Sequence, residues 1–177
     1  MKERILSSSH VLMGYLDKHN LVDINAVKNF ILNESELFLQ RHEKRYKDFY
    51  LDYNDQVDWI NKEVVAKVRA YHNIGLMPTM HKGEVHYYKE CTLKRNGLNL
   101  HDLASSPDYT TLFIVNSNEE DQLHIEYNDH RNVNKYITYH LKQNMYVTFN
   151  SDLNYYFTEH NATNPRIILN LNHQIVL

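Results

Sequence analysis

Three side chains have the types and spacing to hold a divalent metal ion. His124 and Glu126 lie two residues apart in a stretch with the composition of a β-strand, and His140 follows in the next such stretch. Because side chains two apart on a strand point to the same face of a sheet, this imidazole and this carboxylate could bind one ion. The solvated face of an antiparallel sheet gives the same alternation, and no glycine follows Gly97 to form tight turns around such a site. Both interpretations stay open.

Other chemistries that leave a signature in a sequence find little support. Cys91, the only cysteine, would be a nucleophile only if the fold placed a base beside it. The serines at 7–9, 105 and 106 lie in no glycine-bounded elbow, and 4 glycines in the whole chain are too few for a phosphate-binding loop. We therefore assign no catalytic residue from the sequence.

Size and charge narrow the class of protein. With 177 residues, 42% of them hydrophobic and 12% aromatic, the chain is expected to form one globular domain with a sizeable core. A formal net charge of -3 gives no basic field for nucleic acid, and no apolar run approaches the roughly 20 residues of a membrane span. The single cysteine fits a reducing compartment, and the N-terminal residues lack the pattern of a signal peptide. We expect a cytoplasmic protein with no nucleic-acid or membrane partner.

The first half of the chain has helical spacing. Weak helical periodicity covers residues 4–20, and a clearer helix is expected to begin after Asp23. The pattern continues through the charged run to Asp48, with an interruption at residues 33–35. A further helix that ends before Gly75 has its apolar face at Val57, Ile60, Val64, Val68 and Tyr71.

The spacing changes to a period of two from Glu84 onward. β-Branched and aromatic residues alternate in short stretches separated by Asn, Asp and Pro, which is typical of antiparallel strands. We expect strands over residues 85–92, 109–116, 122–127, 133–141, 145–149, 155–157 and 166–172. Short turns between them favour a sandwich or jelly roll. The fold class is therefore α+β, a single domain of residues 1–177 with a mainly helical part (1–83) packed on a β part (84–177).

The strand motifs, taken together, resemble a known superfamily. Thr110-Thr-Leu-Phe-Ile-Val-Asn116 and Gln122-Leu-His-Ile-Glu-Tyr127 are followed by Phe149-Asn-Ser-Asp-Leu-Asn-Tyr155 and by Asn164-Pro-Arg-Ile-Ile-Leu-Asn-Leu-Asn172. Over roughly residues 84–172 this pattern resembles the Fe(II)/2-oxoglutarate-dependent oxygenases (dioxygenases), in particular short oxygenase-like proteins encoded by bacteriophages. The resemblance implies an antiparallel double-stranded β-helix (jelly roll) over residues 84–177, with Fe(II) and 2-oxoglutarate as cofactors if the protein is active.

In that superfamily a His-x-Asp pair and a distal His hold the iron, and a basic residue on the final strand binds the far carboxylate of 2-oxoglutarate. Arg166 stands at the position of that basic residue, and a guanidinium binds a carboxylate in bidentate fashion. An arginine that forms an ordinary salt bridge at the start of a strand is the alternative interpretation.

The iron ligands depart from the superfamily pattern. Tyr155 occupies the position of the distal His, and the nearest histidine, His160, falls in the turn that follows. The upstream pair corresponds to His101 and Asp102, which are adjacent, so a bulge would be needed for both to reach one ion. Asn99 would share a face with His101 but is a weak, neutral ligand. The resemblance thus implies an irregular metal site of His101, Asp102 and His160, with Arg166 and Tyr155 at the cofactor.

Three hypotheses about function remain. The first is a non-catalytic oxygenase-fold protein (a pseudoenzyme) that serves as a binding or assembly module. It would have a protein partner or form a homo-oligomer, in the cytoplasm, a virion or an infected host cell. The phenol of Tyr155 favours this hypothesis, and the many tyrosines suit interfaces. The second is an active Fe(II)/2-oxoglutarate-dependent hydroxylase with the irregular site, and the third is a sugar- or ligand-binding jelly roll.

Overall fold

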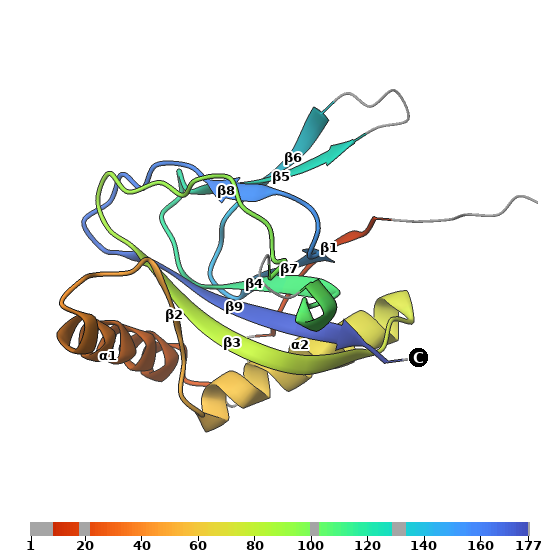
Figure 1. Ribbon diagram of the computed structural model, residues 1–177, viewed down its shortest axis with the longest axis horizontal. Helices are drawn as coiled ribbons and strands as arrows, with labels where there is room; N and C mark the ends of the chain where they lie inside the picture. Colours follow the sequence, from red (N-terminus) through yellow and green to blue (C-terminus); the bar gives the residue numbers. More distant parts are fainter. Residues whose placement is uncertain (1–8, 18–21, 100–102, 129–133, 177) are drawn as a thin grey trace, which may run out of the picture.

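The chain folds into two antiparallel β-sheets and two long helices (Figure 1). The computed structural model describes residues 9–17, 22–99, 103–128 and 134–176. In chain order, its elements are β1 (Val11–Tyr15), α1 (Ile24–His42), β2 (Asp48–Tyr50), α2 (Asp55–His72), β3 (Leu76–His86), the 3-10 helix η1 (Leu103–Ser105), β4 (Tyr109–Asn116), β5 (Gln122–Asn128), β6 (Asn134–His140), β7 (Met145–Asn150), β8 (Tyr155–Phe157) and β9 (Arg166–Ile175). The predicted combination of helices with mostly antiparallel strands is confirmed.

The strands from β4 onward pass back and forth between the two sheets. The larger sheet has the order β1-β7-β4-β9-β3-β2 and the smaller one β6-β5-β8, and neighbouring strands are antiparallel. The sheets face each other around a shared apolar cluster, which includes Leu112 and Ile168 of the larger sheet and Leu123 and Phe157 of the smaller one. This arrangement of two facing antiparallel sheets is a jelly roll.

Strand β9 lies inside the larger sheet and separates two cores. Ile167 and Leu169 pack in the cluster that includes the helices, whereas Ile168 packs in the cluster between the sheets. Since neighbours on a strand point to opposite faces, Arg166 and Asn170 lie on the same side as Ile168. The period of two thus sends polar side chains of β9 into the space between the sheets, which we call the interior.

Helices α1 and α2 cover the other face of the larger sheet (Figure 1). Asp23 caps α1 by accepting the backbone N–H of Asn25 (2.9 Å), and Asn54 caps α2 by accepting that of Gln56 (2.9 Å). Within the described residues, neither helix combines the length and the apolar character that crossing a membrane requires. The buried helical residues that face the sheet are Val27, Ile31, Val57, Ile60, Val64 and Val68.

The predicted course of α1 is wrong at two points. The helix ends at His42 instead of continuing to Asp48, because Glu43 adopts a left-handed conformation (φ 53°) that stops it. Residues 48–50 then pair with β3 as strand β2. The interruption expected at residues 33–35 does not occur, and Ser35 is buried within a continuous helix.

The helix predicted over residues 4–20 is wrong in its described part. Residues 11–15 form β1, which pairs with β7 at the edge of the larger sheet. A short apolar stretch does not distinguish helix from strand by itself, so the available edge of β7 decides its conformation. The strand predicted over residues 85–92 is shifted, because β3 begins at Leu76 opposite the end of β9 and ends at His86.

Candidate functional site

The interior contains ionisable side chains as well as its apolar cluster. Glu84 and His86 of β3, Tyr155 of β8 and Arg166 of β9 are each at most 1% exposed. They occupy alternate positions, where the pleat of each strand faces the opposite sheet. Because a buried charge costs several kcal/mol unless it is paired, the partners of these groups decide which of them could bind a metal ion or a cofactor.

An irregular segment, residues 92–99, runs beside β8 and adds a cation to the interior. Arg95 and Tyr155 exchange two backbone hydrogen bonds, with N–O distances of 3.0 and 2.7 Å. The N–H of Gly97 donates to the carbonyl of Ser151 (2.8 Å), and a Cβ at Gly97 would collide with the hydroxyl of Thr110. Glycine therefore lets this segment approach the sheets closely enough to turn Arg95 inward.

Arg95 forms an ion pair with Glu84 in the interior. Its guanidinium also lies 3.6 Å from the carboxylate of Asp48 and 5.3 Å from the ring centre of Tyr155. Burial alone would lower the pKa of Arg95, but the carboxylates of Glu84 and Asp48 hold it above its ordinary value. The other oxygen of Glu84 accepts a hydrogen bond from the amide of Asn170 (2.9 Å). A matched cation and anion therefore occupy this part of the interior.

The hydroxyl of Tyr155 accepts a hydrogen bond from the amide of Asn170 (3.3 Å). Burial, and then the charge of Glu84, raise the pKa of Tyr155 above its ordinary value, so the phenol stays neutral. Divalent iron prefers imidazole or an ionised oxygen as a ligand. A neutral phenol that faces the guanidinium of Arg95 is a poor ligand for such a cation.

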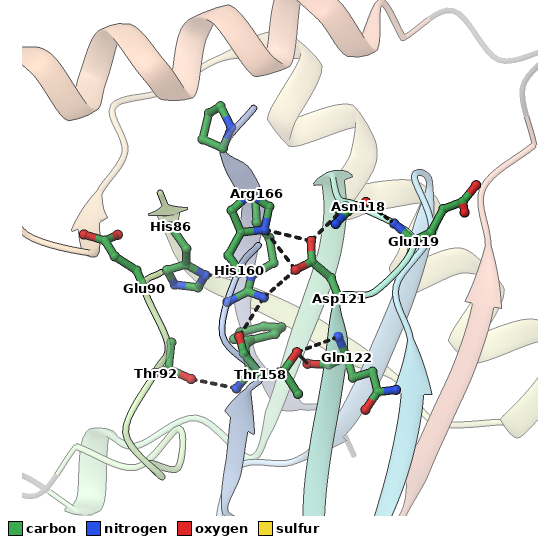
Figure 2. A network of polar contacts seen from close by, with 12 residues as sticks. His86, Glu90, Thr92, Asn118, Glu119, Asp121, Gln122, Thr158, His160 and Arg166 are labelled. Carbon is green, nitrogen blue, oxygen red and sulfur yellow. Dashed lines mark hydrogen bonds and ion pairs between the residues drawn. The ribbon is translucent and has the colours of Figure 1, made fainter. Parts of the chain in front are cut away.

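Arg166, at the start of β9, is bound by groups from three segments, which Figure 2 shows converging on it. Its Nη1 donates to Oδ1 of Asp121 (2.9 Å) and to the carbonyl of Thr158 (3.0 Å), and its Nε donates to Nδ1 of His86 (2.9 Å). Burial lowers the pKa of Arg166, and the charge of Asp121 opposes that effect. The guanidinium therefore already has a carboxylate partner within the chain.

His160 binds the same carboxylate from the connection between β8 and β9. Its Nδ1 lies 2.9 and 3.1 Å from the two oxygens of Asp121, and its Nε2 lies 2.6 Å from the carbonyl of Asn164 (Figure 2). Each ring nitrogen of His160 therefore lies against an oxygen of the chain, and neither points into open space. The N–H of Asn118 donates to the second oxygen of Asp121 (2.8 Å), which completes this arrangement.

His86 lies between Arg166 and Glu84. Since its Nδ1 accepts from Arg166, the proton of the neutral ring is on Nε2, which lies 3.6 Å from a carboxylate oxygen of Glu84. Burial, and then the charges of Arg166 and Arg95, lower the pKa of His86 well below its ordinary value. Nε2 of His86 has no hydrogen-bond partner among the described residues, so His86 lies between the two sets of buried groups but is bonded only to Arg166.

The described residues do not fit an iron site. Among them, no group of three His, Cys, Asp or Glu side chains is arranged to hold a metal ion. The expected binding of 2-oxoglutarate at Arg166 would compete with Asp121, which already accepts from Nη1, whereas Nη2 is buried without a hydrogen-bond partner among the described residues. We therefore derive no reaction step through either cofactor.

Of the three residues predicted to bind the metal, the structure describes only His160. His101 and Asp102 lie outside the described residues, and their role stays a prediction. His160 and Arg166 do come together, but as two partners of Asp121. Asp121 therefore pairs with both His160, the predicted metal ligand, and Arg166, the residue predicted to bind 2-oxoglutarate.

The alternative set of metal ligands lies on the face of the smaller sheet turned away from the interior. Nδ1 of His124 is 2.9 Å from the hydroxyl of Thr138, and the carboxylate of Glu126 is 2.7 Å from Nζ of Lys94. His140 lies opposite Gln122 at the far end of the pairing between β5 and β6. The arrangement matches the solvated sheet face that was the other interpretation of this pattern.

Sequence reasoning missed Glu84, Arg95 and Asp121. Glu84 and His86 did offer a signal, since two ionisable residues at alternate positions flank Val85 on a strand with a buried face. Asp121 and Arg95 gave none, because their partners are far away in the sequence and only the tertiary fold brings them together.

No protein-family profile and no curated protein matches the sequence. The structure is similar to that of the viral collagen prolyl hydroxylase vCPH of Paramecium bursaria Chlorella virus-1 in complex with 2OG, with a TM-score of 0.63, 10% identity, and 95% of this chain and 96% of that chain covered. It is similar to a prolyl hydroxylase of Trichoplax adhaerens in complex with a peptide of hypoxia-inducible factor (TM-score 0.62, 12% identity, 94% and 83% covered). A third similar structure is iron-bound HygX of Streptomyces hygroscopicus (TM-score 0.58, 13% identity, 94% and 81% covered). The jelly roll of this chain is thus the fold of the Fe(II)/2-oxoglutarate oxygenases, as its sequence motifs predicted.

Proposed function

We propose that this protein is a non-catalytic oxygenase-fold protein that acts as a binding or assembly module. The environment of Tyr155 is the observation that carries the proposal. A buried, neutral phenol stands where the superfamily pattern has an imidazole, and it faces the ion pair of Arg95 and Glu84. A divalent cation beside Tyr155 would be repelled by the guanidinium of Arg95 and would find no imidazole ligand there.

Titration of the purified chain with Fe(II) and 2-oxoglutarate under anaerobic conditions tests this proposal. The readout is the visible metal-to-ligand charge-transfer band that such ternary complexes give, with an iron-binding oxygenase of the same fold as the positive control. The expected result is no band. A band that the variants His101→Ala and Arg166→Ala abolish would establish the active hydroxylase instead.

The proposed partner is a protein, and a second copy of the chain is the simplest case. The outer face of the smaller sheet supports this choice. Tyr136 is 60% exposed there, its ring meets the ring of His124 edge-on, and His124 stacks on Tyr156 (4.8 Å between ring centres). Aromatic side chains with polar tips are enriched at protein interfaces.

Light scattering over a range of protein concentrations tests the self-association. We expect a dimer that the variant Tyr136→Asp converts to a monomer. Tyr53→Asp is the matched control, since Tyr53 is 76% exposed but precedes α2, outside the smaller sheet. A wild-type chain that stays monomeric throughout would contradict a second copy as the partner.

A further inference from the structure

We propose that Asp121 is a built-in substitute for a carboxylate ligand of Arg166, which closes this end of the interior to small anions. Arg166 is fully buried and therefore needs a counter-charge within the protein. Asp121, itself 1% exposed, supplies it through a hydrogen bond of 2.9 Å between Oδ1 and Nη1. The proposal concerns this carboxylate position alone and does not depend on whether the chain binds iron.

The donors around Asp121 form a carboxylate-binding cradle, which is the set Nη1 of Arg166, Nδ1 of His160 and the backbone N–H of Asn118. Nη1 of Arg166 and Nδ1 of His160 both lie 2.9 Å from Oδ1, and the backbone N–H of Asn118 lies 2.8 Å from Oδ2. These donors come from β9, from the β8–β9 connection and from the turn before β5, as Figure 2 shows. Charge-assisted hydrogen bonds of this kind are the strong ones. A free carboxylate could make the same bonds if the side chain of Asp121 were absent.

The cradle is held in place by contacts that do not involve the Asp121 side chain. Nε of Arg166 remains bonded to His86, and Nη1 remains bonded to the carbonyl of Thr158 (3.0 Å). The backbone of His160 donates to Glu90 (2.9 Å) and accepts from Lys89 (2.7 Å). Removing the Asp121 carboxylate should therefore leave an anion site with its donors still aimed at the vacated space.

Chemical rescue of the variant Asp121→Ala tests this inference. The substitution removes a group with the shape and charge of formate, so formate should bind in its place. We expect about 100 mM formate to raise the melting temperature of Asp121→Ala by about 2–4 °C. Chloride at the same ionic strength should not, and the melting temperature of the wild-type chain should not respond to formate.

Two further variants keep the test decisive. In Asp121→Ala/Arg166→Met the charge that attracts formate is gone, so the rescue should disappear, while Asp152→Ala removes an exposed aspartate and should behave as wild type. If Asp121→Ala is unfolded in chloride, formate should restore its folded circular-dichroism spectrum. Absence of rescue, rescue that survives the loss of Arg166, or equal stabilisation of the wild-type chain would each overturn the proposal.

Discussion

Two adjacent residues show how differently this chain uses the same kind of charge. Arg95 turns inward and pairs with the fully buried carboxylate of Glu84. Lys94 turns outward and pairs with Glu126 over 2.7 Å, with its own side chain 49% exposed. Water screens the outer pair, whereas the carboxylate of the inner pair is shielded from water.

The variants Arg95→Met and Lys94→Met should therefore differ sharply in stability. Arg95→Met leaves Glu84 buried beside an apolar side chain, and we expect the free energy of unfolding to fall by about 3 kcal/mol. For Lys94→Met we expect a loss below about 1 kcal/mol. Urea unfolding followed by circular dichroism measures both. Similar losses in the two variants would mean that the interior pair is hydrated like the outer one.

A single side chain joins helix α2 to the larger sheet. Asn61 is fully buried in α2; its Oδ1 lies 2.7 Å from Nε2 of His173 on β9, and its Nδ2 lies 2.8 Å from Nε2 of His81 on β3. An amide nitrogen donates and an amide oxygen accepts, so Nε2 of His81 accepts and Nε2 of His173 carries its proton. His81 must be neutral to make its bond, since a protonated ring could not accept, whereas His173 can donate in either protonation state.

The burial of His173 predicts that acid weakens the fold. Burial lowers the pKa of His173 from 6.5 to about 4. Between these values the unfolded chain binds a proton that the folded chain does not, so stability is full above pH 6.5 and falls as the pH decreases toward 4. At pH 5 the loss from His173 should be about 2 kcal/mol. His86, whose pKa is also lowered, adds a loss in the same direction.

Urea midpoints at pH 7 and pH 5 measure the effect. The wild-type midpoint should fall between these two conditions, and the variant His173→Gln should lose less over the same interval because it has one titrating group fewer. An equal fall in both proteins would exclude His173 as the source.

The elements that local pattern controls were predictable, and those that a distant partner controls were not. β4, with Leu112 and Ile114 facing one core and Phe113 the other, follows directly from its alternation. β1 does not, because pairing with β7 across most of the chain gives it its conformation. The position of Arg166 was predicted from its motif, whereas Asp121 was not, since only the packing of the two sheets brings the carboxylate to the guanidinium.

At the scale of the whole molecule, β1 forms one edge of the larger sheet and covers β7. β1 pairs with β7 along its whole length, and Leu12 and Leu16 enter the helix-side core at 9% and 6% exposure. Without β1, β7 would become the edge strand and would present unpaired backbone N–H and C=O groups to other molecules. β1 therefore has two roles, as part of the core and as the cover of β7.

Removal of residues 1–16 should separate these roles. We expect the truncated chain to lose about 3–4 kcal/mol of stability and to self-associate through β7, as measured by urea unfolding and light scattering. Leu12→Ala in the full chain removes apolar contact without opening the edge, so it should lower stability by about 2–3 kcal/mol and leave the association state unchanged. A truncated chain with the association state of the full chain would show that β1 does not protect the edge.

The most direct test of the proposed non-catalytic role is the binding of Mn(II), a hard divalent cation that takes imidazole and carboxylate ligands. Free aqueous Mn(II) gives an electron paramagnetic resonance signal that is lost when the ion binds to protein. With the wild-type chain in excess, and with or without 2-oxoglutarate, an interior occupied by Arg95, Glu84 and the Arg166 network predicts that the free signal is unchanged. Loss of the signal with one ion bound per chain, abolished in His101→Ala, would contradict this and establish a working metal site.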